Sequence, residues 1–168
     1  MTDDLKRLWA PWRLEYIETA DHPGTECFLC DALRMDDDRR GLVLFRGAAA
    51  FALLNRYPYN NGHLLVAPNR HLGTLDQLDS GETAALFELV RRAVGWIERA
   101  YNPHGFNIGI NLGRTAGAGL PGHLHIHIVP RWDGDTNFMP VLGGTKVISE
   151  GLSSSYERLQ RQISKGGL

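Results

Sequence analysis

The sequence predicts an α+β fold: an antiparallel sheet of about five strands, one long helix and a short C-terminal helix. Most of its short apolar runs are joined by hairpin-length links, whereas parallel strands need crossovers of a dozen or more residues. One long amphipathic segment can cover a face of such a sheet. The composition, 43% hydrophobic and 22% charged residues, is that of an ordinary globular protein.

The 168 residues are expected to form a single domain over 1–168. Within it we expect an aromatic N-terminal arm over 1–20, a core over 27–132 and a C-terminal extension over 133–168. No apolar run approaches the ~18–20 residues that span a bilayer, and the charged start lacks the apolar segment of a secretory signal. A cytoplasmic protein with no membrane partner is expected.

The charge balance gives no sign of nucleic-acid binding. Eighteen basic and nineteen acidic side chains leave a formal net charge of -1, so no strong global field attracts polyanions. The chain also has no basic tract interleaved with aromatic residues that could hold a nucleic-acid strand. Any phosphate binding must therefore be local.

The first strands are predicted from three apolar runs. Residues 42–45 and 49–54 fit neighbouring antiparallel strands joined by a tight turn. The run 63–67 is a third strand, which ends at Pro68 because proline cannot donate to a ladder. The charged stretch 36–40 before them has no apolar period and is expected to be a solvated loop.

Asp79, with Glu82 three residues later, is typical of a capping box and predicts the start of the long helix. The segment 102–105 is expected to end it. The expected buried stripe of this helix consists of Leu86, Val90, Val94, Ile97 and Tyr101.

The rest of the sheet is predicted after that helix. Alternation over 106–111 indicates a strand with Phe106, Ile108 and Ile110 on one face. A glycine-rich stretch over 113–122 leads into a strand over 123–129. A short helix is expected over 155–163.

Three histidines alternate along the last predicted strand. His123, His125 and His127 are expected to project from one face, because successive side chains on a strand point to opposite sides. A merely solvent-exposed polar face is the simpler alternative. Alternate residues lie ~6.5–7 Å apart along a strand, too far for all three to reach one metal ion without bending. One or two of them could still bind a metal.

The glycine-rich stretch before the histidines suggests the electrophile. An imidazole is both a nucleophile and a proton carrier near neutral pH. Glycine-rich backbone offers uncrowded N–H groups that suit phosphate oxygens, although a flexible hairpin loop would have the same composition. The combination points to phosphoryl or nucleotidyl transfer.

Cys27 and Cys30 are the only cysteines, and their spacing is that of half a tetrahedral zinc site. Two reduced, buried thiols or a redox pair are the alternatives.

The segment 123–129 resembles the signature of the histidine triad family of nucleotide hydrolases and transferases. The segments 55–68 and 111–117 resemble the upstream strand pair and nucleotide loop of that family, so the resemblance covers 27–132. The segments 8–17 and 137–148 further resemble its bacterial branch related to diadenosine tetraphosphate phosphorylases.

The resemblance implies that His125 attacks the α-phosphorus of a nucleotide and forms a covalent nucleotidyl-histidine intermediate, which water or phosphate then resolves. His127 and His63 would line the same site. The implied nucleotide-binding residues are Asn55, Asn111, Gly117, Ala118 and Gly119. Turn roles for the two asparagines, and an edge role for His63, remain the alternatives.

One departure affects the acceptor. Many family members carry glutamine where this chain has Ala118. Losing that side chain could make room for inorganic phosphate, or could transfer the role to backbone N–H groups. The resemblance implies dinucleoside polyphosphate substrates such as diadenosine tetraphosphate. A phosphoramidate or acyl-adenylate hydrolase, and a nucleotide-binding regulatory module with little turnover, are the alternatives.

The resemblance also implies a structural zinc ion held by Cys27, Cys30, His71 and His123, with no organic cofactor. It implies a homodimer, or a higher homo-oligomer, in which two five-stranded sheets join.

Overall fold

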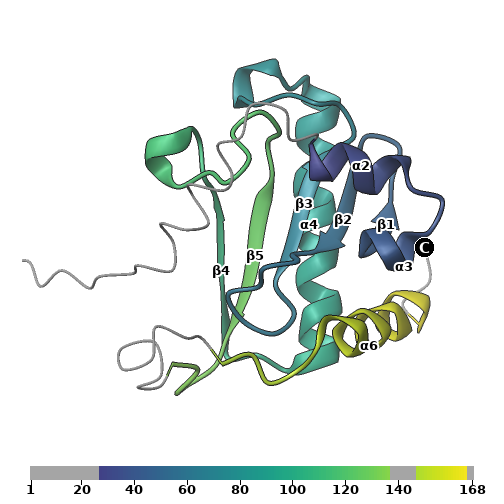
Figure 1. Ribbon diagram of the computed structural model, residues 1–168, viewed down its shortest axis with the longest axis vertical. Helices are drawn as coiled ribbons and strands as arrows, with labels where there is room; N and C mark the ends of the chain where they lie inside the picture. Colours follow the sequence, from purple (N-terminus) through teal and green to yellow (C-terminus); the bar gives the residue numbers. More distant parts are fainter. Residues whose placement is uncertain (1–26, 137–146, 166–168) are drawn as a thin grey trace, which may run out of the picture.

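The computed structural model describes residues 27–136 and 147–165. Five strands form one sheet in the order β1-β2-β3-β5-β4, and every pairing is antiparallel (Figure 1). The predicted fold class is therefore confirmed. The strands are β1 (Val43–Arg46), β2 (Ala50–Leu54), β3 (Leu64–Pro68), β4 (Gly105–Ile110) and β5 (Ile126–Arg131).

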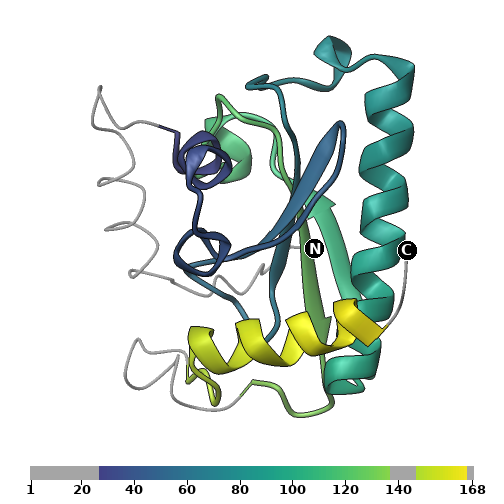
Figure 2. The same cartoon turned by 90° about the vertical axis from the view of Figure 1, so that its right-hand side faces the viewer.

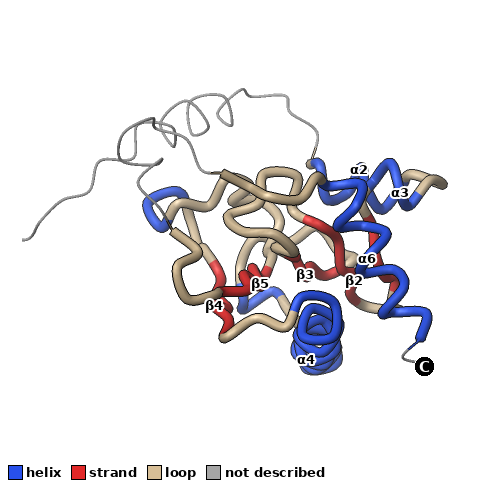
Figure 3. The backbone as a smooth tube through the Cα atoms, turned by 90° about the horizontal axis from the view of Figure 1, so that it is seen from below, coloured by secondary structure: helices blue, strands red, loops and turns tan. Residues whose placement is uncertain are grey.

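The helices lie on both sides of this sheet. They are α2 (Phe28–Arg34), α3 (Asp38–Gly41), η1 (Leu75–Gln77), α4 (Ser80–Tyr101), η2 (Arg114–Ala116) and α6 (Leu152–Lys165). Helix α4 covers one face, and α2 lies on the other (Figure 3). Helix α6 packs across α4 and β1 (Figure 2). The aromatic arm over 1–20 lies outside the described residues.

The capping box predicted for the long helix is confirmed. The Asp79 carboxylate accepts the Glu82 N–H at 2.7 Å, and the Glu82 carboxylate accepts the Asp79 N–H at 3.0 Å. The helix ends at Asn102, which adopts a left-handed conformation with φ 46°. Of the expected stripe, Leu86, Val90 and Ile97 are buried and the other two are partly buried. Leu89, Ala93 and Trp96 are buried as well.

The two faces of the central strands build separate cores. On β2, Ala52 and Leu54 face α4, whereas Phe51 and Leu53 face α2. All five residues of β2 are buried, and so are all five of β3. A strand buried on both faces reads as a continuous apolar run, which is why the sequence marks these strands clearly.

The charged stretch over 36–40 is not simply a loop, which corrects the prediction. The Asp37 carboxylate accepts the Arg40 N–H at 3.1 Å and caps the one-turn helix α3. The Arg39 guanidinium bonds to Glu157 on α6. A short turn of this kind is fixed by its cap and by a distant partner, and neither produces a hydrophobic period.

The last strand begins later than predicted. The structure starts β5 at Ile126 rather than at His123. The Leu124 N–H donates to the Leu72 carbonyl at 2.6 Å, so the backbone here pairs with the segment after β3. His123 therefore leaves the face that His127 occupies.

On β4, Ile108 is 49% exposed, because it lies on the edge strand.

Within the described ranges, no helix is long and apolar enough to cross a membrane.

Candidate active site and metal centre

Three of the predicted site histidines form one cluster. His63 precedes β3, His125 precedes β5, and His127 lies on β5 opposite Leu65 of β3. The His63 Nε2 lies 3.0 Å from the His127 Nδ1, and the ring centroids of His125 and His127 are 5.0 Å apart. His63 is fully buried and His125 is 7% exposed. The pairing of β3 with β5 thus brings together residues more than sixty positions apart.

Two donors fix the tautomer of His63. The Tyr59 N–H donates to the His63 Nδ1 at 3.1 Å, and the Asn55 Nδ2 lies 3.3 Å from the same atom. The Asn55 Oδ1 accepts the Tyr57 N–H, which orients its amide. Because Nδ1 is the acceptor, a neutral His63 carries its proton on Nε2 and donates to His127 Nδ1. His127 then carries its own proton on Nε2.

His125 takes the opposite tautomer. Its Nδ1 lies 2.7 Å from the carbonyl oxygen of His123, which can only accept, so the proton of a neutral His125 stays on Nδ1. Burial lowers the pKa of His125 and also that of His63, which falls to about 3 with further contributions from His127 and His125. His63 and His125 are therefore neutral at pH 7. Together they provide one imidazole with a lone pair on Nε2 and one with an Nε2–H donor.

The predicted zinc ligands lie together at one point. The ligand atoms of Cys27, Cys30, His71 and His123 all fall within 4.8 Å of one another. The His123 Nδ1 lies 3.2 Å from the Cys27 Sγ and 3.5 Å from the Cys30 Sγ, and the His71 Nδ1 lies 3.3 Å from the Cys30 Sγ. Zn–S and Zn–N bonds of about 2.3 and 2.1 Å place tetrahedral ligands about 3.3–3.8 Å apart. These residues fit a zinc ion.

The surroundings of the cluster support metal binding. The His123 Nε2–H donates to the Pro68 carbonyl at 2.9 Å, which leaves the Nδ1 lone pair directed at the thiols. Burial and the neighbouring Cys27 raise the pKa of the Cys30 thiol to about 11. A divalent cation between the two sulfurs would reverse that effect. Both cysteines lie at the start of α2, where Cys27 is the N-cap.

The glycine-rich loop is closed by its own hydrogen bonds. The Gly117 N–H donates to the Arg114 carbonyl and the Ala118 N–H to the Gly113 carbonyl. The Asn111 Nδ2 donates to the Gly117 carbonyl at 3.4 Å. Two backbone donors expected to face phosphate are thus used within the loop. The Gly119 N–H bonds to no other residue in the part of the chain that the structure describes.

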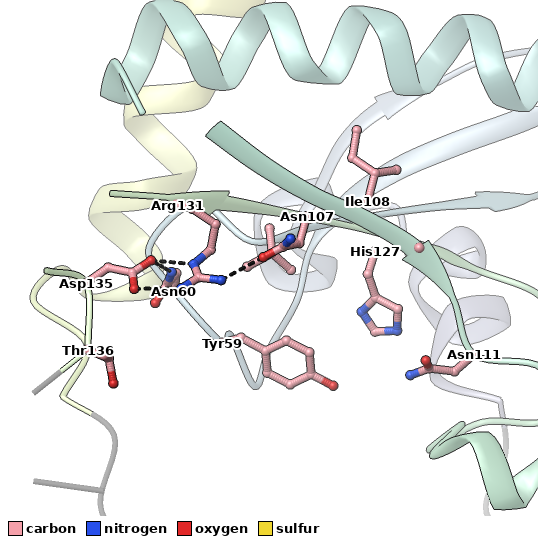
Figure 4. A pocket seen from close by; sticks show the side chains of 11 residues that line it. Tyr59, Asn60, Asn107, Ile108, Asn111, His127, Arg131, Asp135 and Thr136 are labelled. Carbon is pink, nitrogen blue, oxygen red and sulfur yellow. Dashed lines mark hydrogen bonds and ion pairs between the residues drawn. The ribbon is translucent and has the colours of Figure 1, made fainter. Parts of the chain in front are cut away.

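A cavity of about 440 Å³ opens beside His127. We call it the Tyr59 pocket (Figure 4). Apart from His127 and Asn111, its residues are absent from the predicted site. The alternation along β5 offers one signal for them, since it places Arg131 on the same face as His127. The lining residues are Tyr59, Asn60, Asn107, Ile108, Gly109, Asn111, His127, Val129, Arg131, Asp135 and Thr136.

The neutral His63 and His125 take opposite tautomers beside one antiparallel sheet, an arrangement that offers both a nucleophilic nitrogen and an N–H donor. The family described as HIT domain matches residues 39–134. The chain belongs to this family.

Similar proteins match more of the chain than the HIT domain model does. The chain is 42% identical to an AP-4-A phosphorylase of Mycobacterium tuberculosis, over 97% of this chain and 87% of that protein. It is 30% identical to a bis(5'-adenosyl)-triphosphatase of Dictyostelium discoideum, over 76% and 84% of the two chains. A solved histidine triad nucleotide-binding protein of Sulfolobus tokodaii aligns with a TM-score of 0.64 at 29% identity, covering 83% of this chain and 90% of that one.

Proposed function

We propose that this protein is an enzyme that transfers a nucleotidyl group from a dinucleoside polyphosphate through a covalent histidine intermediate. The His125 Nε2 lone pair attacks the α-phosphorus, the N–P bond forms, and the P–O bond to the leaving nucleotide breaks. An acceptor oxygen then attacks the same phosphorus and releases His125. The observation that carries the proposal is the tautomer of His125, whose Nδ1 proton is held by the His123 carbonyl.

The neighbouring histidines support this chemistry. His63 donates to His127 Nδ1, which places the proton of a neutral His127 on Nε2, and this N–H would donate to a non-bridging or leaving oxygen on the reacting phosphorus. Tyr59 and Asn55 hold His63 in the required orientation. The site thus has a nucleophile and a donor prepared before substrate binds.

Inorganic phosphate is the acceptor that we propose. The relative named AP-4-A phosphorylase is similar over nearly the whole chain. Ala118 adds no polar side chain to the loop at the position where the histidine triad pattern has glutamine. With diadenosine tetraphosphate, phosphorolysis would give ADP and ATP.

A zinc ion would be bound by Cys27, Cys30, His71 and His123. It would link three segments of the chain and supply a structural cross-link. The ion itself takes no part in the transfer step.

We further infer that two chains pair through β4. This strand is an edge of the sheet, and Ile108 and Leu112 near it are 49% and 44% exposed. At the other edge, helix α6 bonds to the carbonyls of β1, through Tyr156 to Val43 at 3.0 Å and Gln160 to Leu44 at 3.1 Å.

The decisive experiment incubates the protein with diadenosine tetraphosphate, with and without inorganic phosphate, and identifies the products by chromatography. We expect ADP and ATP only when phosphate is present, and at least about a 1,000-fold loss of turnover in His125→Ala. The exposed His104→Gln is the matched control. AMP and ATP formed regardless of phosphate would replace phosphorolysis by hydrolysis. Undiminished turnover in His125→Ala would contradict the mechanism.

A further inference from the structure

The Tyr59 pocket extends beyond the atoms that the transfer step uses. Its floor is the face of β4 and β5 that points away from α4, because Ile126 and Ile128 occupy the α4 side. Gly109 lies directly opposite His127, and Asn107 lies opposite Val129 two residues further along. Gly109 adds no side chain, and a Cβ built there would meet no atom within 4 Å. The floor beside His127 is therefore open.

The far end of the pocket is polar, and among the described residues that line it the charges of Arg131 and Asp135 offset each other. The Arg131 guanidinium bonds to Asp135, with Nη2 to Oδ1 at 2.9 Å, and to the Asn107 Oδ1 at 2.7 Å. Asn60, 7% exposed, donates to Asp135 at 2.8 Å and to the Pro130 carbonyl at 3.0 Å. Arg131 holds the pKa of Asp135 well below its usual range, so the pair stays ionised. This end suits a neutral ligand better than a phosphate chain.

The shape and donors of the pocket suit a flat heterocycle. Tyr59 is 46% exposed, and its ring lies 11° from parallel to the His127 ring, with the ring centroids 5.8 Å apart. Figure 4 shows this ring across the opening from Asn107 and Arg131. The Asn107 Oδ1 accepts a hydrogen bond from Arg131. The Nδ2 of the same amide can therefore act as a donor, and no described residue accepts a hydrogen bond from this Nδ2. Purine nitrogens are acceptors that match such a donor.

The distance from the nucleophile indicates which base would bind. Ile126 pairs with Ile110, so His125 is level with Asn111, four residues from Asn107 along β4. Four residues span about 13 Å of strand. This distance leaves room for a short polyphosphate chain and its ribose between the reacting phosphorus and the Asn107 end of the pocket, so a base at that end belongs to the departing side of the substrate.

We infer that the Tyr59 pocket binds the purine base of the leaving nucleotide and so selects dinucleoside over mononucleoside polyphosphates. The inference rests on the proposed function, because His125 marks the reacting phosphorus. Stacking of one base gives a preference of about tenfold or more.

The test compares diadenosine tetraphosphate with adenosine 5'-tetraphosphate, which lacks the second nucleoside. Turnover is measured for both, and calorimetry gives the affinities of their methylene-bridged analogues. Gly109→Val is the test variant, because its side chain would occupy the floor of the pocket and its Cβ would meet no protein atom within 4 Å. Gly105→Val is the matched control, since a Cβ there also meets no atom within 4 Å and Gly105 does not line the pocket. Gel filtration checks that both variants keep the oligomeric state of the parent protein.

We expect the parent protein to bind the dinucleoside analogue at least about tenfold more tightly than the mononucleoside one. Gly109→Val should reduce this ratio to within about threefold, and Gly105→Val should keep it. A ratio near one in the parent protein, or an unchanged ratio in Gly109→Val, would overturn the inference. Absence of turnover with the binding ratio intact would refute the proposed function and leave the pocket assignment standing.

Discussion

The protonation of the whole histidine cluster depends on His63. Its Nδ1 already accepts from Tyr59 and lies beside the Asn55 amide, so a second proton there would face two donors. His127 and His125 are its other titratable neighbours, and either one would repel it when charged. Fully buried in this setting, His63 stays neutral, and its pKa falls to about 3. The same bonds that orient His127 therefore create a pH-dependent contribution to stability.

Stability should fall in acid because of this residue. In the unfolded chain His63 binds a proton near pH 6.5, whereas the folded protein resists protonation down to about pH 3. The free energy of unfolding therefore decreases as the pH falls through this window, by about 1.4 kcal/mol per pH unit from His63. Between pH 8 and pH 5 the contribution is about 2 kcal/mol.

Urea denaturation at pH 5 and pH 8 measures this effect. The variant His63→Gln should lose about 2 kcal/mol less stability than the parent protein across the interval, even if it is less stable at both values. The exposed His104→Gln should keep the full pH dependence. If His63→Gln kept it too, the buried imidazole would not be its source.

At the scale of elements, the Cys/His cluster joins three separate parts of the chain. It links the first turn of α2 to the segment after β3 and to the segment before β5. His123 belongs to this cluster, and its own carbonyl accepts the His125 Nδ1 proton. Whatever fixes the backbone at 123 also fixes the orientation of His125, the proposed nucleophile. The Cys/His cluster and the histidine cluster are thus neighbouring parts of one structure.

We expect about one zinc per chain in protein purified without added metal, measured by elemental analysis. Removing the metal with a chelator, or replacing a ligand by Cys30→Ser, should lower the melting temperature by about 10 °C or more. Either change should also lower kcat more than it raises KM, because the His123 carbonyl, which orients His125, would move. Asp31→Asn on the same helix is the control. A zinc content well below one per chain, with an unchanged melting temperature in Cys30→Ser, would refute the four-ligand site.

At the scale of the whole molecule, the sheet has two edges of different character. Helix α6 supplies hydrogen bonds to the carbonyls of β1. Strand β4 has no neighbouring strand on its outer side within the described residues, and Ile108 is half exposed there. An unpaired strand edge is a template for pairing with another chain.

The chain should therefore sediment as a dimer. The variant Ile108→Asp places a charge at the edge where the two sheets join, so it should raise the dissociation constant of the dimer at least about tenfold. Sedimentation equilibrium measures this, with thermal unfolding to confirm that the variant is folded. Leu75→Asp is the matched control, since Leu75 is 46% exposed and lies away from β4. A parent protein that remains monomeric would contradict the β4 interface.

Local periodicity predicted the sheet and the long helix, and a contiguous motif predicted His125 and His127. The spacing of Cys27 and Cys30 predicted half of a zinc site. The family resemblance alone added His63 to the histidine cluster, and His71 and His123 to the Cys/His cluster. Periodicity alone placed His123 on the same face as His127. The backbone bond from Leu124 to Leu72, which turns His123 toward the cysteines, leaves no local pattern.

The Tyr59 pocket was missed for a similar reason. Asn60, Asn107 and Asp135 come from three separate segments, and only the hydrogen bonds to Arg131 and between their side chains bring them together. Asn107 and Asp135 lie in no quoted motif, and Asn60 lies in the segment 55–68, for which the resemblance implied roles only for Asn55 and His63. Taken singly, an asparagine or an aspartate near a turn is more typical of a turn residue than of a binding site.

The side chains of α6 that bond to β1 have one more consequence. If two chains pair through β4, each outer edge of the joined sheet is a β1 strand whose carbonyls at 43 and 44 are already occupied. A symmetric pairing of this kind uses the same surface on both copies, so it leaves no second β4 edge for a third chain. The assembly would be self-limiting: adding more protein would produce more dimers, and the sheet would not grow into a fibre.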